Sequence, residues 1–120
     1  MGLIWQKRML GPEIQIHKDL PAMSRAAAQM IVATAINALQ SRGQITLALS
    51  GGSTPLALFG LLAQSPFRDQ LPWGQMHFFW ADERCVPPSH PESNYGQAQR
   101  TLFDHVPAPP GNLHRVHGEL

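Results

Sequence analysis

The chain has 120 residues and a mass of 13.2 kDa, which predicts one domain at most. Hydrophobic residues make up 43% of the sequence and charged residues 14%, a balance that argues against intrinsic disorder and against a solvated helical bundle. Nine Lys and Arg residues stand against eight Asp and Glu residues, so the net charge of +1 provides no strong field for nucleic acid or acidic lipid. We therefore expect a globular domain that binds neither nucleic acid nor membranes.

No segment has the length of a membrane span or the form of a signal peptide. The longest uncharged stretch, residues 43–67, is interrupted by SGGSTP, whereas a spanning helix needs about 20 apolar residues in continuity. Lys7 and Arg8 are followed by only two apolar residues before a glycine and a proline. The single cysteine, Cys85, is predicted to be a small buried residue in a reducing compartment. Together these features predict a cytoplasmic protein.

The first elements follow from hydrophobic periodicity. Residues 1–12 show no period, so we predict a leader there and a domain over residues 13–120. Residues 13–17 alternate polar and apolar side chains, which predicts a strand with one buried face. A helix is predicted to start at Asp19-Leu20-Pro21 and to end at Arg42, before Gly43. Its expected apolar face consists of Met23, Ala27, Met30, Ile31, Thr34, Ala35 and Leu39.

The rest of the chain alternates strands with helices. Residues 45–49 are short and almost wholly apolar, which predicts a parallel strand covered on both faces. A buried helix is predicted over residues 56–63 and an aromatic strand over residues 76–81. A short helix over residues 94–103 and a strand over residues 113–116 follow. This order predicts an α/β fold, a layered and Rossmann-like parallel sheet, with ligands at the carboxyl ends of the strands.

The loop between the first buried strand and the next helix is a candidate phosphate site. Its residues are Ser50, Gly51, Gly52, Ser53 and Thr54. The glycines allow positive φ and a close approach to a ligand, while Thr54 is expected to cap a helix that starts at Pro55. N–H groups and hydroxyls at the positive end of a helix favour an anion. The alternative interpretation is an ordinary tight turn.

Other motifs fit this sequence less well. The loop lacks the lysine of a Walker A motif and the third glycine of a dinucleotide fingerprint, which disfavours ATP and NAD. It can also be interpreted as an altered nucleophile elbow with Ser53 as the attacking hydroxyl, but Pro55 replaces the closing glycine. No metal ion is expected, because neither available pair of ligands has the spacing of a zinc site: Cys85 with His90, or His114 with His117.

Three charged residues, Asp82, Glu83 and Arg84, follow the aromatic strand and form the second candidate site. They stand at the carboxyl end of a predicted central strand, where ligand contacts are expected. The planar guanidinium of Arg84 suits phosphate or carboxylate, and Asp82 is able to accept a proton or orient a sugar hydroxyl. The alternative is a solvated loop whose charges pair among themselves. Further along, Ser93 is predicted to cap a helix, with Tyr95 packed behind it.

Several motifs occur together at consistent spacing. They are LSGGSTP at residues 49–55, Trp73, FFWADERCVP at residues 78–87, His90, SNY at residues 93–95 and VHGE at residues 116–119. From about Glu13 to its end, the sequence resembles the amino-terminal half of the 6-phosphogluconolactonases, within a group that includes the glucosamine-6-phosphate deaminases. The deaminases typically have Tyr where this chain has Arg84, so the resemblance is to the lactonase branch.

The resemblance implies hydrolysis of 6-phosphogluconolactone to 6-phosphogluconate in the oxidative pentose phosphate pathway, without a cofactor. It also implies that residues 50–54 hold the phosphate of this sugar-phosphate lactone and that Arg84 contributes to phosphate or substrate binding. Asp82 corresponds to a carboxylate that transfers protons in the deaminases, and it is the one catalytic candidate in this chain.

One departure from the family pattern concerns the general base. In the family this base is a His in a Gly-x-Asp-Gly-His segment, and no Asp-Gly-His occurs in these 120 residues. We therefore expect a truncated α/β domain that is inactive in isolation. The alternative is a sugar-phosphate-binding module without catalysis, although no helix-turn-helix accompanies it. No particular oligomeric state is predicted.

Overall fold

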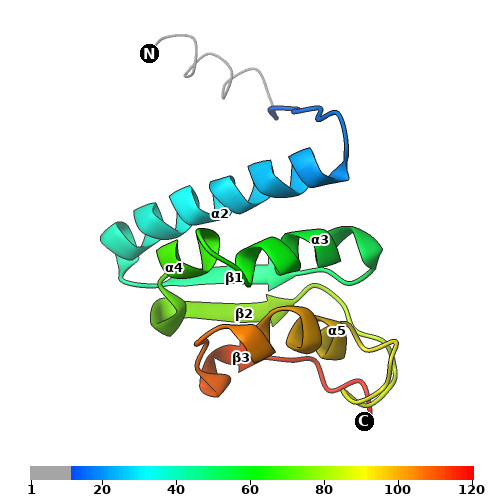
Figure 1. Cartoon of the computed structure of the whole chain (residues 1–120). Helices are drawn as coiled ribbons and strands as arrows, with labels where there is room; N and C mark the ends of the chain where they lie inside the picture. Colours follow the sequence, from blue (N-terminus) through cyan, green and yellow to red (C-terminus); the bar gives the residue numbers. More distant parts are fainter. Residues whose placement is uncertain (1–11) are drawn as a thin grey trace, which may run out of the picture.

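The computed structural model describes residues 12–120 (Figure 1), so the predicted leader lies outside the described residues except for its last position. The helices are α2 (Leu20–Arg42), α3 (Ser53–Leu62), α4 (Phe67–Gln70) and α5 (Asn94–Thr101). The strands are β1 (Ile45–Leu49), β2 (Met76–Trp80) and β3 (Leu113–His114). Three short 3₁₀ turns, Trp73–Gln75, Phe103–His105 and Pro110–Asn112, connect these elements.

Helix α2 has the ends that the sequence predicts. The Asp19 carboxylate accepts a hydrogen bond from the N–H of Ala22 at 2.9 Å, and Pro21 lies in the first turn. At the other end, Gly43 adopts a φ of 74° and its N–H donates to the carbonyl of Leu39 at 2.9 Å. A left-handed residue in this position is the ordinary reason for a glycine after a helix.

The buried face of α2 differs from the predicted face. The buried residues are Ser24, Ala28, Ala35 and Ala38, whereas Met23 and Met30 are 41% and 57% exposed. Helix α2 packs along α3 (Figure 1), and small buried side chains allow two helix backbones to approach closely. The predicted face is right at Ala35 and wrong at Met23 and Met30, because the prediction gave weight to large apolar residues.

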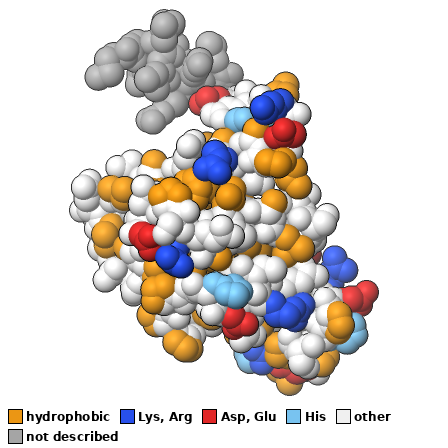
Figure 2. Space-filling view, in the orientation of Figure 1, with side chains coloured by type: hydrophobic (Ala, Val, Ile, Leu, Met, Phe, Trp, Pro, Cys, Tyr) orange, Lys and Arg blue, Asp and Glu red, His pale blue; other side chains and the backbone are white. Residues whose placement is uncertain are grey.

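The three strands form a parallel sheet, as the sequence predicts, and their order is β1-β2-β3. Helices α3 and α5 lie on one side of this sheet (Figure 1). The side chains that they cover are Ile45, Leu47, Leu49, Met76, Phe78, Trp80 and Leu113. Phe78 is the centre of this core, since it is fully buried and contacts Phe103 edge-on at a centroid distance of 4.8 Å. Figure 2 shows the helical side of the molecule, where charged side chains are sparse.

The opposite face of the sheet, here named the open face, consists of Thr46, Ala48, His77, Phe79 and His114. Phe79 is 40% exposed and stacks on the His114 ring at 4.5 Å. The Nδ1 atom of His77 lies 3.1 Å from Nε2 of His114. The expected cover on both faces of residues 45–49 is therefore not present within residues 12–120.

Other boundaries also differ from the predictions. Residues 13–17 form no strand, and Ile14 and Ile16 are 81% and 92% exposed, because no described strand pairs with this segment. The helix predicted from residue 94 ends at Thr101, and the last strand stops at His114. Among the residues described, no helix is long and apolar enough to cross a membrane.

Candidate functional site

The two candidate loops leave the sheet side by side. Strands β1 and β2 are parallel, and their last residues, Leu49 and Trp80, are register partners. One further hydrogen bond extends the ladder, because the N–H of Ala81 donates to the carbonyl of Leu49 at 2.9 Å. Residues 50–54 and 82–84 therefore begin next to each other at the carboxyl edge of the sheet, where α3 and α5 also begin (Figure 1).

The first loop ends in a turn at Gly52 that opens helix α3. Gly52 has a φ of 96° and a ψ of 179°, and the helix begins at Ser53. The predicted cap at Thr54 is wrong, because the glycine turn starts the helix before Thr54, which lies within the first turn. Within residues 12–120, no side chain caps this helix start. Gly52, Ser53 and Thr54 are exposed, and the first N–H groups of a helix have no partner within the helix, a combination that suits an anion site.

The geometry of this loop does not support the nucleophile elbow. An elbow places its serine on a strained turn between strand and helix. In residues 12–120 only glycines have positive φ, so the strained conformation belongs to Gly52 and Ser53 has ordinary helical geometry. Ser53 is therefore a binding candidate rather than a strained nucleophile.

Glu83, which the sequence groups with the ligand contacts, instead caps α5. Its Oε1 accepts hydrogen bonds from the N–H groups of Arg84 at 2.8 Å and Asn94 at 2.7 Å. Its Oε2 accepts from the Ser93 hydroxyl at 2.9 Å and the Tyr95 N–H at 3.1 Å. All four hydrogen bonds that the Glu83 carboxylate accepts therefore come from donors of the protein. Glu83 thus holds the loop and the helix start together.

These contacts set the charge state of Glu83. Burial raises the pKa of its carboxyl, but the hydrogen bonds lower it by more: those from the N–H groups of Arg84, Asn94 and Tyr95 and from the Ser93 hydroxyl. The pKa therefore lies below the ordinary value, and Glu83 is a carboxylate at neutral pH.

Ser93 caps α5 as predicted. Its hydroxyl oxygen accepts a hydrogen bond from the N–H of Gly96 at 3.1 Å while its hydroxyl hydrogen is donated to Glu83. The Tyr95 ring packs behind it against Trp80, with a centroid distance of 5.1 Å. The residue order SNY therefore has a local structural reason at its first and third positions.

Asp82 and Arg84 remain exposed on either side of Glu83. Asn94 Nδ2 donates to the carbonyl oxygen of Asp82 at 3.3 Å and to its Oδ1 at 3.2 Å. The ion pairs in the described part of the chain are Arg68–Asp69, Arg115–Glu119 and His117–Glu119, and none includes this loop. The alternative in which its charges pair among themselves is therefore not what the structure shows. Cys85 is exposed in the same loop, so its predicted burial is wrong.

The segment after β3 closes against the Asp82–Arg84 loop. A Cβ on Gly118 would overlap the carbonyl oxygen of Arg84, so this close approach requires glycine. Arg115 binds Glu119 with two hydrogen bonds of 3.0 and 2.9 Å, and its guanidinium lies 6.0 Å from the Tyr95 ring centroid. The hydrogen bonds from Arg115 lower the pKa of Glu119 to about 2. The VHGE motif thus supports the second loop, a role that sequence analysis missed.

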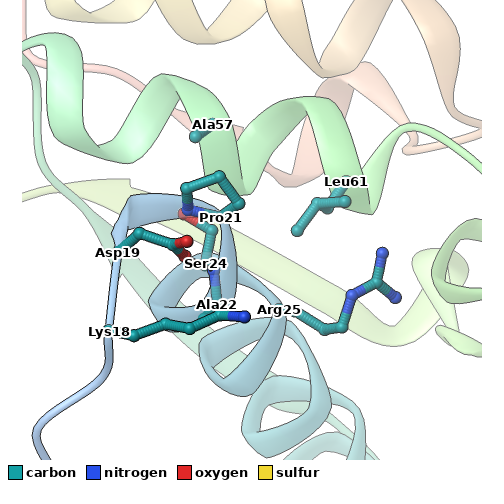
Figure 3. Close-up of a pocket in the computed structure, with 8 residues that line it drawn as sticks. All are labelled: Lys18, Asp19, Pro21, Ala22, Ser24, Arg25, Ala57 and Leu61. Carbon is teal, nitrogen blue, oxygen red and sulfur yellow. Dashed lines mark hydrogen bonds between the residues drawn. The ribbon is translucent and has the colours of Figure 1, made fainter.

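A hollow lies away from the candidate site. This cavity of about 490 Å³ opens between the start of α2 and α3 (Figure 3). Its lining residues are Lys18, Asp19, Pro21, Ala22, Ser24, Arg25, Ala57 and Leu61. None of the predicted site residues lines it. Across residues 12–120, no three His, Cys, Asp or Glu side chains are grouped so as to hold a metal ion.

Known proteins are similar to this chain in sequence and in fold. The chain is 45% identical over 98 residues to the 6-phosphogluconolactonase of Haemophilus influenzae, an alignment that covers 82% of this chain and 40% of that protein. The crystal structure of 6-phosphogluconolactonase from Leishmania guyanensis superimposes with a TM-score of 0.75 at 31% identity, over 87% of this chain and 38% of that one. A monomeric glucosamine-6-phosphate deaminase, at 17% identity, shares the fold with a TM-score of 0.78 over 91% and 44% of the two chains.

The matched relatives are longer than this chain, which spans about 40% of the length of the Haemophilus influenzae protein. The family described as glucosamine-6-phosphate isomerases/6-phosphogluconolactonase matches residues 18–120, which is most of the sequence and includes both loops at the carboxyl edge of the sheet. The chain therefore belongs to the glucosamine-6-phosphate isomerase/6-phosphogluconolactonase family.

Proposed function

We propose that this chain forms the substrate-phosphate side of a 6-phosphogluconolactonase. The observation that carries the proposal is the meeting of an uncapped helix start, at residues 50–54, with the exposed Arg84 at one edge of the sheet. A phosphate dianion suits such an edge, because N–H groups and hydroxyls are exposed there. The Arg84 guanidinium is also available, since it has no carboxylate partner among residues 12–120. The similarity to 6-phosphogluconolactonases supports the lactone as substrate.

In the proposed reaction, a water oxygen attacks the lactone carbonyl carbon and the ring C–O bond breaks. One proton of the water goes to the ring oxygen and the other is released to solvent as the carboxylate forms. The phosphate, held by residues 50–54 and Arg84, fixes the position of the ring. Asp82, at the same edge, is placed to accept a proton or to orient a sugar hydroxyl. The step needs no cofactor, and we propose the cytoplasm as its site.

The general base of this reaction is not assigned to this chain, since the sequence contains no Asp-Gly-His. General-base catalysis contributes about 10²–10⁴-fold, so residues beyond those described are needed for turnover. The same observation favours a second candidate function, a sugar-phosphate-binding module without catalysis. Both candidates require that the carboxyl edge of the sheet bind phosphate.

A titration distinguishes this site from an ordinary turn. The ¹⁵N-labelled chain is titrated with 6-phosphogluconate and, as the matched control, with gluconate, which lacks the phosphate. We expect saturable shifts of the Gly51, Gly52 and Arg84 amides with 6-phosphogluconate and none with gluconate. Equal shifts with both compounds, or shifts confined to the cavity beside α2, would contradict the proposed phosphate site.

A further inference from the structure

We propose that Asn94 is a positioning residue that fixes the distance between the phosphate loop, residues 50–54, and Asp82. The inference rests on the proposed function, because it is in that reaction that the phosphate site and Asp82 act on one substrate. Among residues 12–120, no side-chain hydrogen bond joins the two loops directly, and the backbone ladder ends at the hydrogen bond between Ala81 and Leu49, just before both loops. The Asn94 amide is a side chain that lies against both loops.

Asn94 is buried, and hydrogen bonds fix both its backbone and its side chain. It is the first residue of α5 and only 3% exposed, although its side chain is polar. Its N–H donates to Glu83 Oε1 at 2.7 Å, which ties its backbone to the loop that carries Asp82. A buried amide requires partners, and it finds them at Asp82: Nδ2 donates to the carbonyl oxygen at 3.3 Å and to Oδ1 at 3.2 Å.

The other side of the same amide contacts the phosphate loop. A Cβ built on Gly51 would overlap Oδ1 and Cγ of Asn94, so the Gly51 backbone lies directly against this group. The φ of Gly51 is not positive, and a side chain at this position is therefore excluded by Asn94 and not by backbone strain. One buried side chain thus touches both loops.

The chemistry of an amide suits this position. It donates a hydrogen bond to the Asp82 carboxylate without adding charge beside a site for a dianion. A carboxylate in its place would repel both Asp82 and the bound phosphate, while an alanine would leave a gap between the loops. We therefore expect the identity of residue 94 to control phosphate affinity although it does not itself contact the phosphate.

The first test compares two asparagines in the 120-residue chain. Asn112 is the matched control, because its Nδ2 likewise donates to two oxygens, here the backbone carbonyls of Gly74 at 3.2 Å and Met76 at 2.9 Å, at the other end of β2. The Kd for inorganic phosphate and for 6-phosphogluconate is measured by NMR titration. Asn94→Asp is expected to raise both values about 10-fold or more, and Asn112→Asp to change them less than about 2-fold. An equal effect of the two substitutions would overturn the proposal.

The second test does not depend on a ligand. Gly51→Ala should lower the urea midpoint of unfolding in the wild-type background, because the new methyl group meets Asn94. In an Asn94→Ala background the overlapping atoms are absent, so the same substitution should cost little. Additive effects of the two substitutions would show that Asn94 does not set the position of the loop, and would overturn the proposal.

The two tests separate this proposal from the proposed function. Suppose that the wild-type chain binds neither ligand but that the effects of substitutions at Gly51 and Asn94 are coupled. This result would contradict the proposed phosphate site and would support the placement of the loops by Asn94. A wild-type chain that binds 6-phosphogluconate, with an affinity that Asn94→Asp leaves unchanged, would retain the proposed function and overturn the role of Asn94.

Discussion

At the residue scale, neighbouring charges at the sheet edge have separate tasks. Glu83 accepts four hydrogen bonds from the protein, whereas Asp82 and Arg84 are exposed toward solvent. Glu83→Gln should lower the free energy of unfolding by about 1–3 kcal/mol, because an amide replaces one acceptor oxygen among these donors. Urea unfolding at pH 7 measures the loss, and Glu92→Gln, an exposed glutamate in the same loop, serves as control. Equal midpoints for the two variants would contradict the capping role.

The same carboxylate predicts a pH dependence. Since the folded-state pKa of Glu83 lies below the ordinary value of 4.5, its contribution to stability is present above pH 4.5 and is lost as the pH falls through the folded-state pKa. The difference in stability between wild type and Glu83→Gln should therefore shrink below pH 4.5. Glu119, whose pKa is lowered from 4.5 to about 2, should lose its contribution as the pH falls through that range. A difference that stays constant from pH 7 to pH 3 would contradict the assignment.

Arg84 is the residue on which the proposed phosphate affinity depends most directly. A hydrogen bond to a charged group contributes about 1.5–3 kcal/mol, so Arg84→Ala should raise the Kd for 6-phosphogluconate by roughly 10-fold to 150-fold. Arg84→Lys should recover only part of this loss, because an ammonium group lacks the planar two-point contact. Isothermal titration calorimetry measures the Kd of both variants for 6-phosphogluconate, and Arg42→Ala, at the far end of α2, is the control. Wild-type affinity in Arg84→Ala would show that Arg84 is only a surface charge.

Sequence patterns located this edge of the sheet but did not separate the tasks of its residues. Asp82, Glu83 and Arg84 form one charged run in the sequence, and only the fold shows that the α5 helix start reaches back to Glu83. The contact of Asn94 with Gly51 joins residues 43 positions apart, which no local spacing predicts. The SNY motif contains Asn94, but only its first and third residues, Ser93 and Tyr95, had a structural explanation in the sequence analysis.

At the scale of elements, helix α2 stabilises the fold through small side chains. Ala35 is fully buried, whereas Ala33 on the same helix is exposed. Ala35→Leu should destabilise the protein by about 1–3 kcal/mol, because the added carbons have no space in a closely packed helix contact. Ala33→Leu makes the same chemical change on the outside and should shift stability by no more than about 0.5 kcal/mol. Thermal unfolding gives the Tm of the two variants, and similar shifts of Tm from the wild-type value would contradict the described packing.

The elements themselves were largely predictable, as were several helix ends, whereas the buried faces were not. The capping residues Asp19, Gly43 and Ser93 mark helix ends in the sequence because each has a local hydrogen bond or dihedral requirement. The burial of a face depends instead on what packs against it, so residues 13–17 alternate without forming a strand, and Met23 and Met30 of α2 are exposed. Tertiary contacts decide such cases.

At the scale of the whole molecule, the open face is the main exposed apolar surface of the sheet among residues 12–120. It carries Phe79 beside His77 and His114, and β1 forms an edge with no strand beyond it. Such surfaces favour self-association. Phe79→Lys should therefore increase the monomeric fraction at a given concentration. Analytical ultracentrifugation checks this, with Phe67→Leu in the buried core as a control that leaves the open face intact. A wild-type chain that is already fully monomeric would contradict the expectation.

We have proposed that this chain supplies the phosphate side of a lactonase site, with the rest of the site supplied by residues outside those described. The rate of 6-phosphogluconolactone hydrolysis tests this in a chimera that joins this chain to the part of the Haemophilus influenzae 6-phosphogluconolactonase that it does not match. We expect hydrolysis well above the spontaneous rate for the chimera and none above it for the 120-residue chain alone. A folded chimera that is no faster than the spontaneous reaction, or an isolated chain that is as fast as the chimera, would contradict it.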